Sequence, residues 1–342
     1  MKKRHSLLFI AAAILIGCSS KHNKSPHQVI TLEASVDTVI SLDMCIYPIQ
    51  IETVGDYLVI LDLGNKTQCL SAYSLDGELI QRFGNAGHAA NEVNEVSHFF
   101  KMDEHRISVN KPGGILYFDL DSFDGSNCQY EYKHIKTSPV SVHSIYADSL
   151  GVLCLSNSKE ERFSYTNEEG STFVYNSYPT EFIDQPNDQQ AVFNYAPKFG
   201  VDMKKKRFCV GTYIGGILET FQISSSGIES LGKNELFRSK YKKFENGAVS
   251  WNEKSQIGFD AISIGDEHIY TLLSGAKGDC LLKGEQASFA DKITVFNWDA
   301  TLHSEIYVGH NMLSLCVSEE RKEIYAICYK QGESFYLIHA TW

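Results

Sequence analysis

Several acidic side chains and one histidine lie near the starts of predicted strands, where they could together bind a metal ion. They are Glu52, Asp103, His143, Asp202 and Asp260. Calcium prefers oxygen ligands, so carboxylates that converge from different parts of the chain would favour this ion. A chain with six similar repeats, however, offers many such positions by chance. The sequence therefore leaves calcium possible and assigns no residue as a metal ligand.

Motifs for other catalytic chemistry are missing from the sequence. It contains no Gly-x-Ser-x-Gly segment of the kind that presents a nucleophilic serine. It has no Cys-x-x-Cys pair and no Cys/His cluster with the spacing of zinc ligands. The glycine-bearing loop at 83–93 lacks the strand–loop–helix context and the Lys-Ser/Thr pair of a phosphate-binding loop. We name no catalytic residue and expect a binding protein rather than an enzyme.

Two tryptophans could stack on sugar rings. Trp298 lies in the predicted strand Lys292–Asp299, where we expect it to pack between neighbouring sheets. Trp251 lies in a predicted loop and is the better candidate for a stacking platform. Carbohydrate binding at Trp251 therefore remains an alternative function.

The elements that must position these residues are strands, and they repeat. A turn followed by a β-rich apolar run occurs six times, at Asp56–Ile60, His105–Val109, Gly151–Leu155, Arg207–Val210, Glu267–Thr271 and Glu323–Ile327. Successive copies are 45 residues apart at the least (Ile107 to Val152) and 61 at the most (Phe208 to Ile269). A four-stranded propeller blade takes about 40–50 residues, and longer copies can carry loop insertions. The sequence predicts an all-β fold, a six-bladed β-propeller over residues 28–342.

The two ends of the chain predict how the ring closes. Only three strand candidates follow Asn311, so the last blade is one strand short. The segment Val29–Leu42 has the apolar positions to supply that strand. Closure of the last blade by an N-terminal strand would remove exposed sheet edges.

Aromatic residues, cysteines and loops fit the same architecture. An aromatic residue precedes a polar one at Tyr73, Phe118, Tyr175, Phe221 and Phe296, and we expect these rings to pack sheet against sheet.

Cysteines 69, 154, 209, 316 and 328 lie in apolar strand-like runs, which predicts buried thiols, with one or two disulfides possible. Residues 176–197 and 232–257 are predicted to be long loops between blades, where binding residues often lie.

The N-terminus resembles the signal peptide of bacterial lipoproteins. Lys2, Lys3 and Arg4 precede the apolar run Leu7–Ile16, which is too short to span a bilayer. The segment Leu15-Ile16-Gly17-Cys18 resembles a lipobox. The resemblance implies a signal peptide at 1–17, lipid attachment at Cys18 and a lipidated tether over 18–27. It also implies a cell-envelope protein held on a membrane by its acyl chains. Because Ser19 is not aspartate, we expect the outer membrane.

Charge argues against one class of partner. Removal of residues 1–17 takes away Lys2, Lys3 and Arg4 and no acidic residue, so the formal charge moves from −11 to −14. The basic run Lys204–Arg207 is short enough for a turn between strands. A surface this acidic repels a phosphate backbone, so we expect no binding to nucleic acid.

The loop Phe83–Val93 resembles a Phe-Gly-x-x-Gly-x-Gly-Pro-Gly-Glu-Phe loop in TolB-like six-bladed propeller lipoproteins, a group close to NHL-repeat propellers. Phe83, Gly84, Gly87 and Glu92 match, whereas Ala89-Ala90-Asn91 replaces Gly-Pro-Gly. We expect Gly84 and Gly87 to provide positive φ angles. The resemblance implies the propeller and an envelope location but no particular reaction. Six-bladed propellers include calcium-dependent lactonases and esterases, which keeps such a hydrolase as an alternative.

We therefore expect a monomeric, lipid-anchored scaffold that binds an envelope protein or a peptide. His88, Asn91 and Glu92 are predicted to contribute to binding because their loop departs from the family pattern. Trp251 is the predicted platform of the carbohydrate-binding alternative. No cofactor is expected apart from the calcium considered above.

Overall fold

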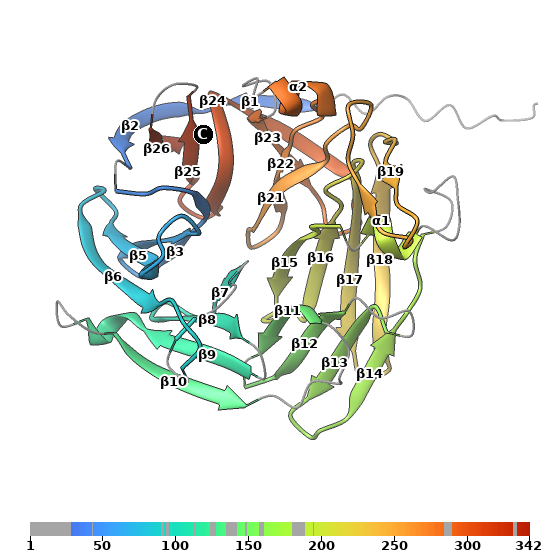
Figure 1. The fold of residues 1–342 in the computed structure, drawn as a ribbon, viewed down its shortest axis with the longest axis horizontal. Coiled ribbons are helices and arrows are strands. Elements are labelled where there is room, and N and C mark those ends of the chain that lie inside the picture. The colour runs from blue at the N-terminus through green and yellow to red at the C-terminus, as the bar shows by residue number, and fades with distance from the viewer. Residues whose placement is uncertain are drawn as a thin grey trace, which may run out of the picture.

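The structure is a ring of small antiparallel sheets around a central axis (Figure 1). It is a computed structural model and describes residues 29–42, 44–89, 92–93, 96, 98–111, 114–123, 128–134, 142–147, 149–156, 161–179, 189–193, 195–283, 289–330 and 334–342. The predicted signal peptide, the tether, Cys18 and Asn91 lie outside these residues. The predicted all-β, six-bladed propeller is confirmed by the strand pairing.

The first four blades are separate four-stranded sheets in which each strand pairs with the next. Blade 1 is β3 (Pro48–Val54), β4 (Tyr57–Asp62), β5 (Gln68–Ser74) and β6 (Leu79–Asn85). Blade 2 is β7 (Phe99–Lys101), β8 (Arg106–Lys111), β9 (Gly114–Asp119) and β10 (Gln129–His134), with a short helix η1 (Leu120–Ser122) after β9. Blade 3 is β11 (Val142–Ala147), β12 (Gly151–Ser156), β13 (Phe163–Asn167) and β14 (Thr172–Tyr175). Blade 4 is β15 (Lys198–Asp202), β16 (Arg207–Gly211), β17 (Ile217–Ser224) and β18 (Gly227–Glu235).

Blades 5 and 6 share one long strand. Blade 5 contains β21 (Phe259–Ile264), β22 (Ile269–Leu273), β23 (Ala290–Phe296) and the first part of β24 (Leu302–Ser318). From Met312 onward β24 becomes the inner strand of blade 6, where it pairs with β25 (Glu323–Tyr329), which pairs with β26 (Phe335–Thr341). The positive φ of Gly309, +76°, lies between these two parts. Each of the six predicted β-rich runs lies in the second strand of its blade.

The N-terminal segment closes the ring, as predicted, but as two strands. β2 (Ser35–Ser41) pairs antiparallel with β26 and completes blade 6. β1 (Ile30–Glu33) instead runs parallel to β24, with Ile30 opposite Ser304, and so extends blade 5. The segment Val29–Leu42 thus forms two strands and not the single predicted strand. The segment therefore joins the last two blades to each other.

Polar side chains link the inner strands of neighbouring blades. The Gln50 amide donates to the carbonyl of Phe99 at 2.8 Å and accepts from its N–H at 3.0 Å, which joins blades 1 and 2. The Ser314 hydroxyl accepts from the N–H of Ile51 at 3.2 Å. The Ser263 hydroxyl accepts from the N–H of Val317 at 3.1 Å. Because these groups are buried, each bond holds blades together at a site that water does not reach.

The repeated aromatic residues occupy equivalent places in four of five cases. Tyr73, Phe118, Phe221 and Phe296 are buried in the third strands of their blades. Tyr175 lies instead in β14, a fourth strand, and pairs with Phe163. Trp298 follows the end of β23 rather than lying within the strand as predicted, and it packs 4.1 Å from the Arg207 guanidinium of blade 4. Its expected position between blades is confirmed.

The α-helices of the described residues lie in longer connections. Residues 176–197 join blades 3 and 4 and contain α1 (Gln189–Phe193), whereas α2 (Gly278–Lys283) lies between β22 and β23. Most of 232–257 joins blades 4 and 5, as predicted, but it includes the hairpin of β19 (Lys242–Lys243) and β20 (Val249–Ser250). No helix in the described ranges is long and apolar enough to cross a membrane.

The five strand cysteines are buried free thiols, as predicted.

The ring has two faces with different connections. We call the face that carries the links between blades the connection face, and the opposite face, with the turns between first and second strands, the turn face. His88, Glu92 and Trp251 lie in connections between blades and thus on the connection face. Glu52 lies on the channel wall, and Asp103 and Asp202 lie toward the turn face.

Candidate functional site

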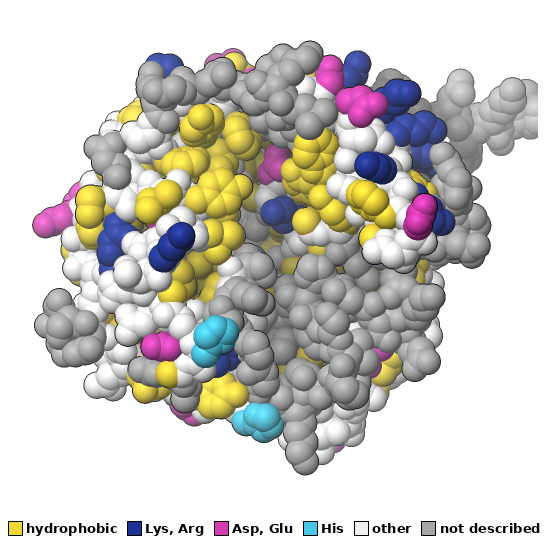
Figure 2. All heavy atoms as spheres, viewed as in Figure 1, with side chains coloured by type: hydrophobic (Ala, Val, Ile, Leu, Met, Phe, Trp, Pro, Cys, Tyr) yellow, Lys and Arg dark blue, Asp and Glu magenta, His cyan; other side chains and the backbone are white. Residues whose placement is uncertain are grey.

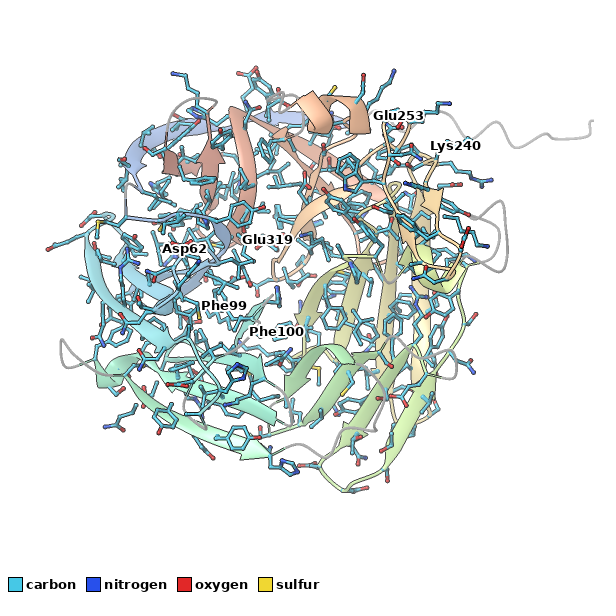
Figure 3. All side chains as sticks on the ribbon, in the orientation of Figure 1. Asp62, Phe99, Phe100, Lys240, Glu253 and Glu319 are labelled. Carbon is cyan, nitrogen blue, oxygen red and sulfur yellow. The ribbon has the colours of Figure 1, made fainter. Side chains whose placement is uncertain are left out.

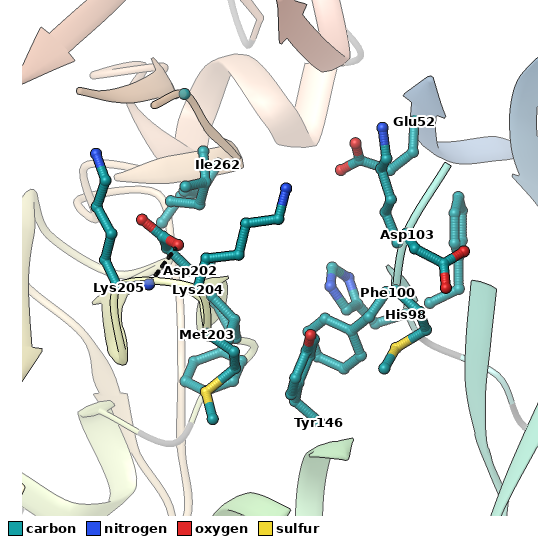
Figure 4. Close-up of a pocket in the computed structure, with 18 of the residues that line it drawn as sticks. Glu52, His98, Phe100, Asp103, Tyr146, Asp202, Met203, Lys204, Lys205 and Ile262 are labelled. Carbon is teal, nitrogen blue, oxygen red and sulfur yellow. Dashed lines mark hydrogen bonds between the residues drawn. The ribbon is translucent and has the colours of Figure 1, made fainter. Parts of the chain in front are cut away.

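Three of the predicted acids meet at one cavity in the central channel. The cavity has a volume of about 430 Å³, and Glu52, Asp103 and Asp202 line it together with residues of β7, β15 and β21 (Figure 4). Because the first strand of each blade lies at the axis, side chains far apart in sequence converge there. His143 lies in β11, but its side chain is outside the described part of the chain.

Two of these acids form hydrogen bonds within the hairpins that carry them. The Asp103 carboxylate accepts from the Arg106 guanidinium at 2.7 and 2.9 Å. The Asp202 carboxylate accepts from Arg207 Nε at 2.9 Å and from the backbone N–H of Lys205 at 3.1 Å. These bonds fix the turns from the first to the second strands of blades 2 and 4. Asp103 and Asp202 therefore hold the cavity rim in place.

Glu52 differs because its carboxylate has no hydrogen-bond donor among the described residues. It projects from β3 into the cavity (Figure 4). Burial raises its pKa to about 7, and the nearby positive charge of Lys101 opposes that rise. The Lys101 ammonium is bound to the Glu104 carboxylate at 2.8 Å. Glu52 is thus a desolvated acid that can take up or release a proton near neutral pH.

Aromatic rings form the wall across from Glu52. The Phe100 ring lies edge-on to Tyr146 at 5.4 Å, to Phe199 at 6.2 Å and to His98 at 4.5 Å. Phe100, Tyr146 and Phe199 are buried in one core cluster, so their positions are set by packing. Such a wall suits an apolar or aromatic group.

A second set of charged groups lies nearer the connection face. Burial raises the pKa of Asp260 to about 7 against the effect of Lys198, and burial lowers the pKa of Lys198 against the effect of Asp260. Burial also lowers the pKa of His98 to about 3, and Lys198 adds to this shift. The Asp260 Oδ2 atom is buried and has no hydrogen-bond partner among the described residues. Figure 2 shows acidic and basic side chains inside the central hollow.

The donor set of the channel does not favour calcium. Within the described ranges, no group of three or more His, Cys, Asp and Glu side chains is placed to hold a metal ion. Glu52 has Lys101 as its charged neighbour and Asp260 has Lys198. A lysine beside each acid supplies a positive charge where a calcium ion would need further oxygen ligands.

On the connection face, the loop before β3 and the turn after β4 lie side by side, joined by the Leu63 N–H to Tyr47 carbonyl bond at 3.0 Å, and present apolar side chains to solvent. Met44, Ile46, Tyr47 and Leu63 have exposed fractions of 62, 66, 54 and 45%. Hydrophobic side chains gather over blade 1 beside the central hollow in Figure 2. We call these four residues the apolar loop patch.

A buried carboxylate holds the apolar loop patch. Asp62 is fully buried at the end of β4 (labelled in Figure 3). It accepts from the backbone N–H groups of Ile46 at 2.9 Å, Tyr47 at 2.7 Å and Gly64 at 3.0 Å. A Cβ atom at Gly64 would lie 2.4 Å from the Cβ of Ile46, so only glycine permits this approach. The loop is therefore held rigidly with its apolar side chains outward.

Of the predicted binding residues, His88 and Glu92 lie in the connection between β6 and β7, whereas Trp251 lies between β20 and β21. His88 is exposed in the loop after β6. The Glu92 carboxylate turns back and accepts from the Ala89 N–H at 2.9 Å, and a Cβ at Gly87 would lie 2.0 Å from it. Gly84 and Gly87 have φ angles of +69° and +154°, as expected. Glu92 therefore closes its own loop, and its role in binding stays a prediction.

Trp251 follows β20 in the connection between blades 4 and 5. It is half-buried, and its ring approaches Gly278, where an added Cβ would lie 3.2 Å from it. One part of the ring therefore packs against the start of α2. Its role as a sugar platform stays a prediction.

Sequence reasoning missed two groups, Asp62 and Arg162. Asp62 follows an apolar run directly and precedes Leu63-Gly64-Asn65, a turn signal that could have indicated a loop-capping carboxylate. The Arg162 guanidinium is buried against Glu219, 57 positions away along the chain. No local pattern indicates such a pair.

Comparisons with known proteins agree with this architecture. The structure is similar to a member of the DUF4221 family from Bacteroides vulgatus, with a TM-score of 0.56, 11% identity and coverage of 90% of this chain and 97% of that one. It is also similar to a putative exported protein from Bacteroides fragilis, with a TM-score of 0.54, 11% identity and coverage of 91 and 98%. A luciferin-regenerating enzyme shares the fold at a TM-score of 0.50 and 10% identity, with coverage of 89 and 95%.

These structural likenesses concern the fold alone, because the identities are low. No curated protein sequence matches the chain. The family model described as TolB-like 6-blade propeller-like matches residues 23–320. The chain therefore belongs to the TolB-like six-bladed propeller family.

Proposed function

We propose that this protein is a monomeric, lipid-anchored scaffold of the cell envelope that binds an apolar peptide segment of another envelope protein on its connection face. The apolar loop patch carries the proposal. Exposed apolar side chains are most informative when they lie together, as Met44, Ile46, Tyr47 and Leu63 do. Three backbone hydrogen bonds to Asp62 fix the loop before a partner arrives, which lowers the entropy cost of binding.

The chemistry of the patch favours a protein partner. Methionine and tyrosine are enriched at protein interface centres, and Met44, Ile46 and Leu63 offer no ring on which a sugar could stack. The negative charge of the chain disfavours nucleic acid. The partner segment would place apolar side chains over the patch and leave its polar backbone at the rim.

Site-specific photo-crosslinking in cells tests this proposal. A photo-reactive residue at position 44, 46 or 63 of the full chain should give one and the same crosslinked protein. The matched controls are Ile80 and Val174, which are exposed apolar residues on outer strands. The Asp62→Asn substitution should abolish the product from the patch. Equal products from patch and control positions, or no product from the patch, would overturn the proposal.

The anchor is tested separately. The lipobox Leu15–Cys18 supports lipid attachment at Cys18 and an outer-membrane location. Cys18→Ala should abolish labelling of the protein by radioactive palmitate and release it from the membrane fraction. Retention of label and membrane association in this variant would contradict the assignment.

A further inference from the structure

The channel cavity suggests a second site, on the turn face and distinct from the apolar loop patch. Its volume of about 430 Å³ lies in the range of small-molecule pockets, about 300–1,000 Å³. Such pockets combine apolar walls with a few polar groups that fix the orientation of the ligand. The identity of the polar groups left without partners then indicates the chemistry of the ligand.

Most charges around the cavity are already paired. Asp103 is bound by Arg106, Asp202 by Arg207 and Glu104 by Lys101. The Lys205 ammonium lies 2.8 Å from Glu267. Asp266 is at the rim, where its carboxylate is exposed and its charge is screened by solvent. These groups can shape the cavity without contacting a ligand.

One acid and one base project into the cavity, and their charged neighbours, Lys101 for Glu52 and Glu104 for Lys204, act on them only through longer-range electrostatics. Glu52 comes from β3 of blade 1, and Lys204 comes from the turn after β15 of blade 4 (Figure 4). Among the described residues, neither side chain has a hydrogen bond or an ion pair. They point into the cavity from opposite sides, so a ligand between them would meet a negative group at one end and a positive group at the other.

The remaining wall is apolar. Phe100, Tyr146 and Phe199 are fixed by edge-on ring contacts, and Met203 is buried beside them. All four line the cavity. An apolar side chain placed against this wall would be removed from water, while the charged part of the ligand stays between Glu52 and Lys204.

We propose that the cavity binds a free hydrophobic α-amino acid, with its ammonium group on Glu52, its carboxylate on Lys204 and its side chain against the Phe100–Tyr146 wall. A zwitterion meets both unpaired charges at once. Lys204 is exposed, whereas the Glu52 carboxylate is half-buried. A simple carboxylate would place a second negative charge near Glu52, and a simple amine would forgo the contact with Lys204. Recognition therefore requires all three parts of the ligand.

Calorimetric titration of the full-length protein in detergent tests the site. L-phenylalanine and L-leucine should bind at pH 8, whereas 2-phenylethylamine, 3-phenylpropanoate and glycine should bind at least tenfold more weakly. Binding of any of these three analogues as tight as that of L-phenylalanine, or no heat with either amino acid, would overturn the proposal.

Matched variants test whether Glu52 binds the ammonium group of the ligand and Lys204 its carboxylate. Glu52→Gln and Lys204→Met should each weaken L-phenylalanine binding at least tenfold, whereas Glu78→Gln and Lys66→Met, at exposed turn positions, should not change it. A thermal melt of each variant without ligand confirms folding. Unchanged affinity in folded Glu52→Gln or Lys204→Met would contradict the assignment. Crosslinking at the apolar loop patch is independent of these results.

Discussion

Two regions of the ring bury charged side chains in opposite ways. Between blades 3 and 4, the Arg162 guanidinium is 1% exposed and donates to both carboxylate oxygens of Glu219 and, at 3.0 Å, to the carbonyl of Ser177. The rings of Phe163 and Tyr178 lie 4.6 and 4.5 Å from it. In the channel, Glu52 and Asp260 are half-buried, and their carboxylates have no hydrogen-bond donor within the described part of the chain.

The ion pair between blades 3 and 4 is the more deeply buried of the two, and it is also the one whose hydrogen bonds are satisfied. Arg162 has both an opposite charge and further acceptors, which offset the cost of removing it from water. Among the residues that the structure describes, Glu52 and Asp260 have no such donors, and burial raises their pKa values to about 7. Satisfied charges join blades, whereas unsatisfied charges reduce stability and remain available to a ligand.

The largest expected effect is at the satisfied pair. Arg162→Ala leaves the Glu219 carboxylate buried without its partner, so the free energy of unfolding should fall by about 3–5 kcal/mol. Urea denaturation measures this loss.

The matched control removes both charges. The double variant Arg162→Met/Glu219→Leu leaves no unpaired charge and should lose much less stability than Arg162→Ala. Equal losses in the two proteins would mean that packing, and not the ion pair, holds blades 3 and 4 together.

Asp62 extends the comparison to a carboxylate that is satisfied by backbone groups alone. Asp62→Asn keeps the shape but turns an amide N–H toward backbone donors, so it should cost about 2–3 kcal/mol. The exposed Asp56→Asn should have almost no effect. Urea denaturation of both variants checks this, and similar stabilities would show that the loop does not depend on the carboxylate.

Substitution of Glu52 should have the opposite effect on the free energy of unfolding, which it should raise. The pKa of Glu52 is raised from 4.5 to about 7, so its contribution to stability is full below about pH 4.5 and is lost as pH rises to about 7. Glu52→Gln has no such dependence. Relative to the wild type, this variant should gain about 1–3 kcal/mol between pH 5 and pH 8. Denaturation at both pH values measures the gain, and a constant difference between the proteins would show that Glu52 does not titrate in this range.

The smallest expected effect is at Glu92, a satisfied carboxylate near the surface. Glu92→Ala removes its hydrogen bond to the Ala89 N–H and should cost about 1 kcal/mol. His88→Ala, at an exposed position in the same loop, should cost less. Thermal melts of the two variants make the comparison, and a neutral Glu92→Ala would show that the loop holds its shape without this bond.

The strand framework was predictable because its signals are local. A turn followed by β-branched and aromatic residues marks the second strand of every blade, from β4 to β25. The shortage of strands after Asn311 predicted the closure of blade 6 by β2. The parallel pairing of β1 with β24 was not predictable, since it depends on which outer edge lies nearby once the ring has formed.

The sequence by itself determined the six blades, the buried cysteines and the glycines of the family loop, because strand periodicity, apolar runs and positive φ are properties of neighbouring residues. Only the tertiary structure decided which charges meet. Glu52 and Lys204 face one cavity because the first strand of every blade lies at the axis. Arg162 reaches Glu219 because blades 3 and 4 pack side by side. Whether a charge is satisfied depends on such contacts, and these form only when distant parts of the chain come together.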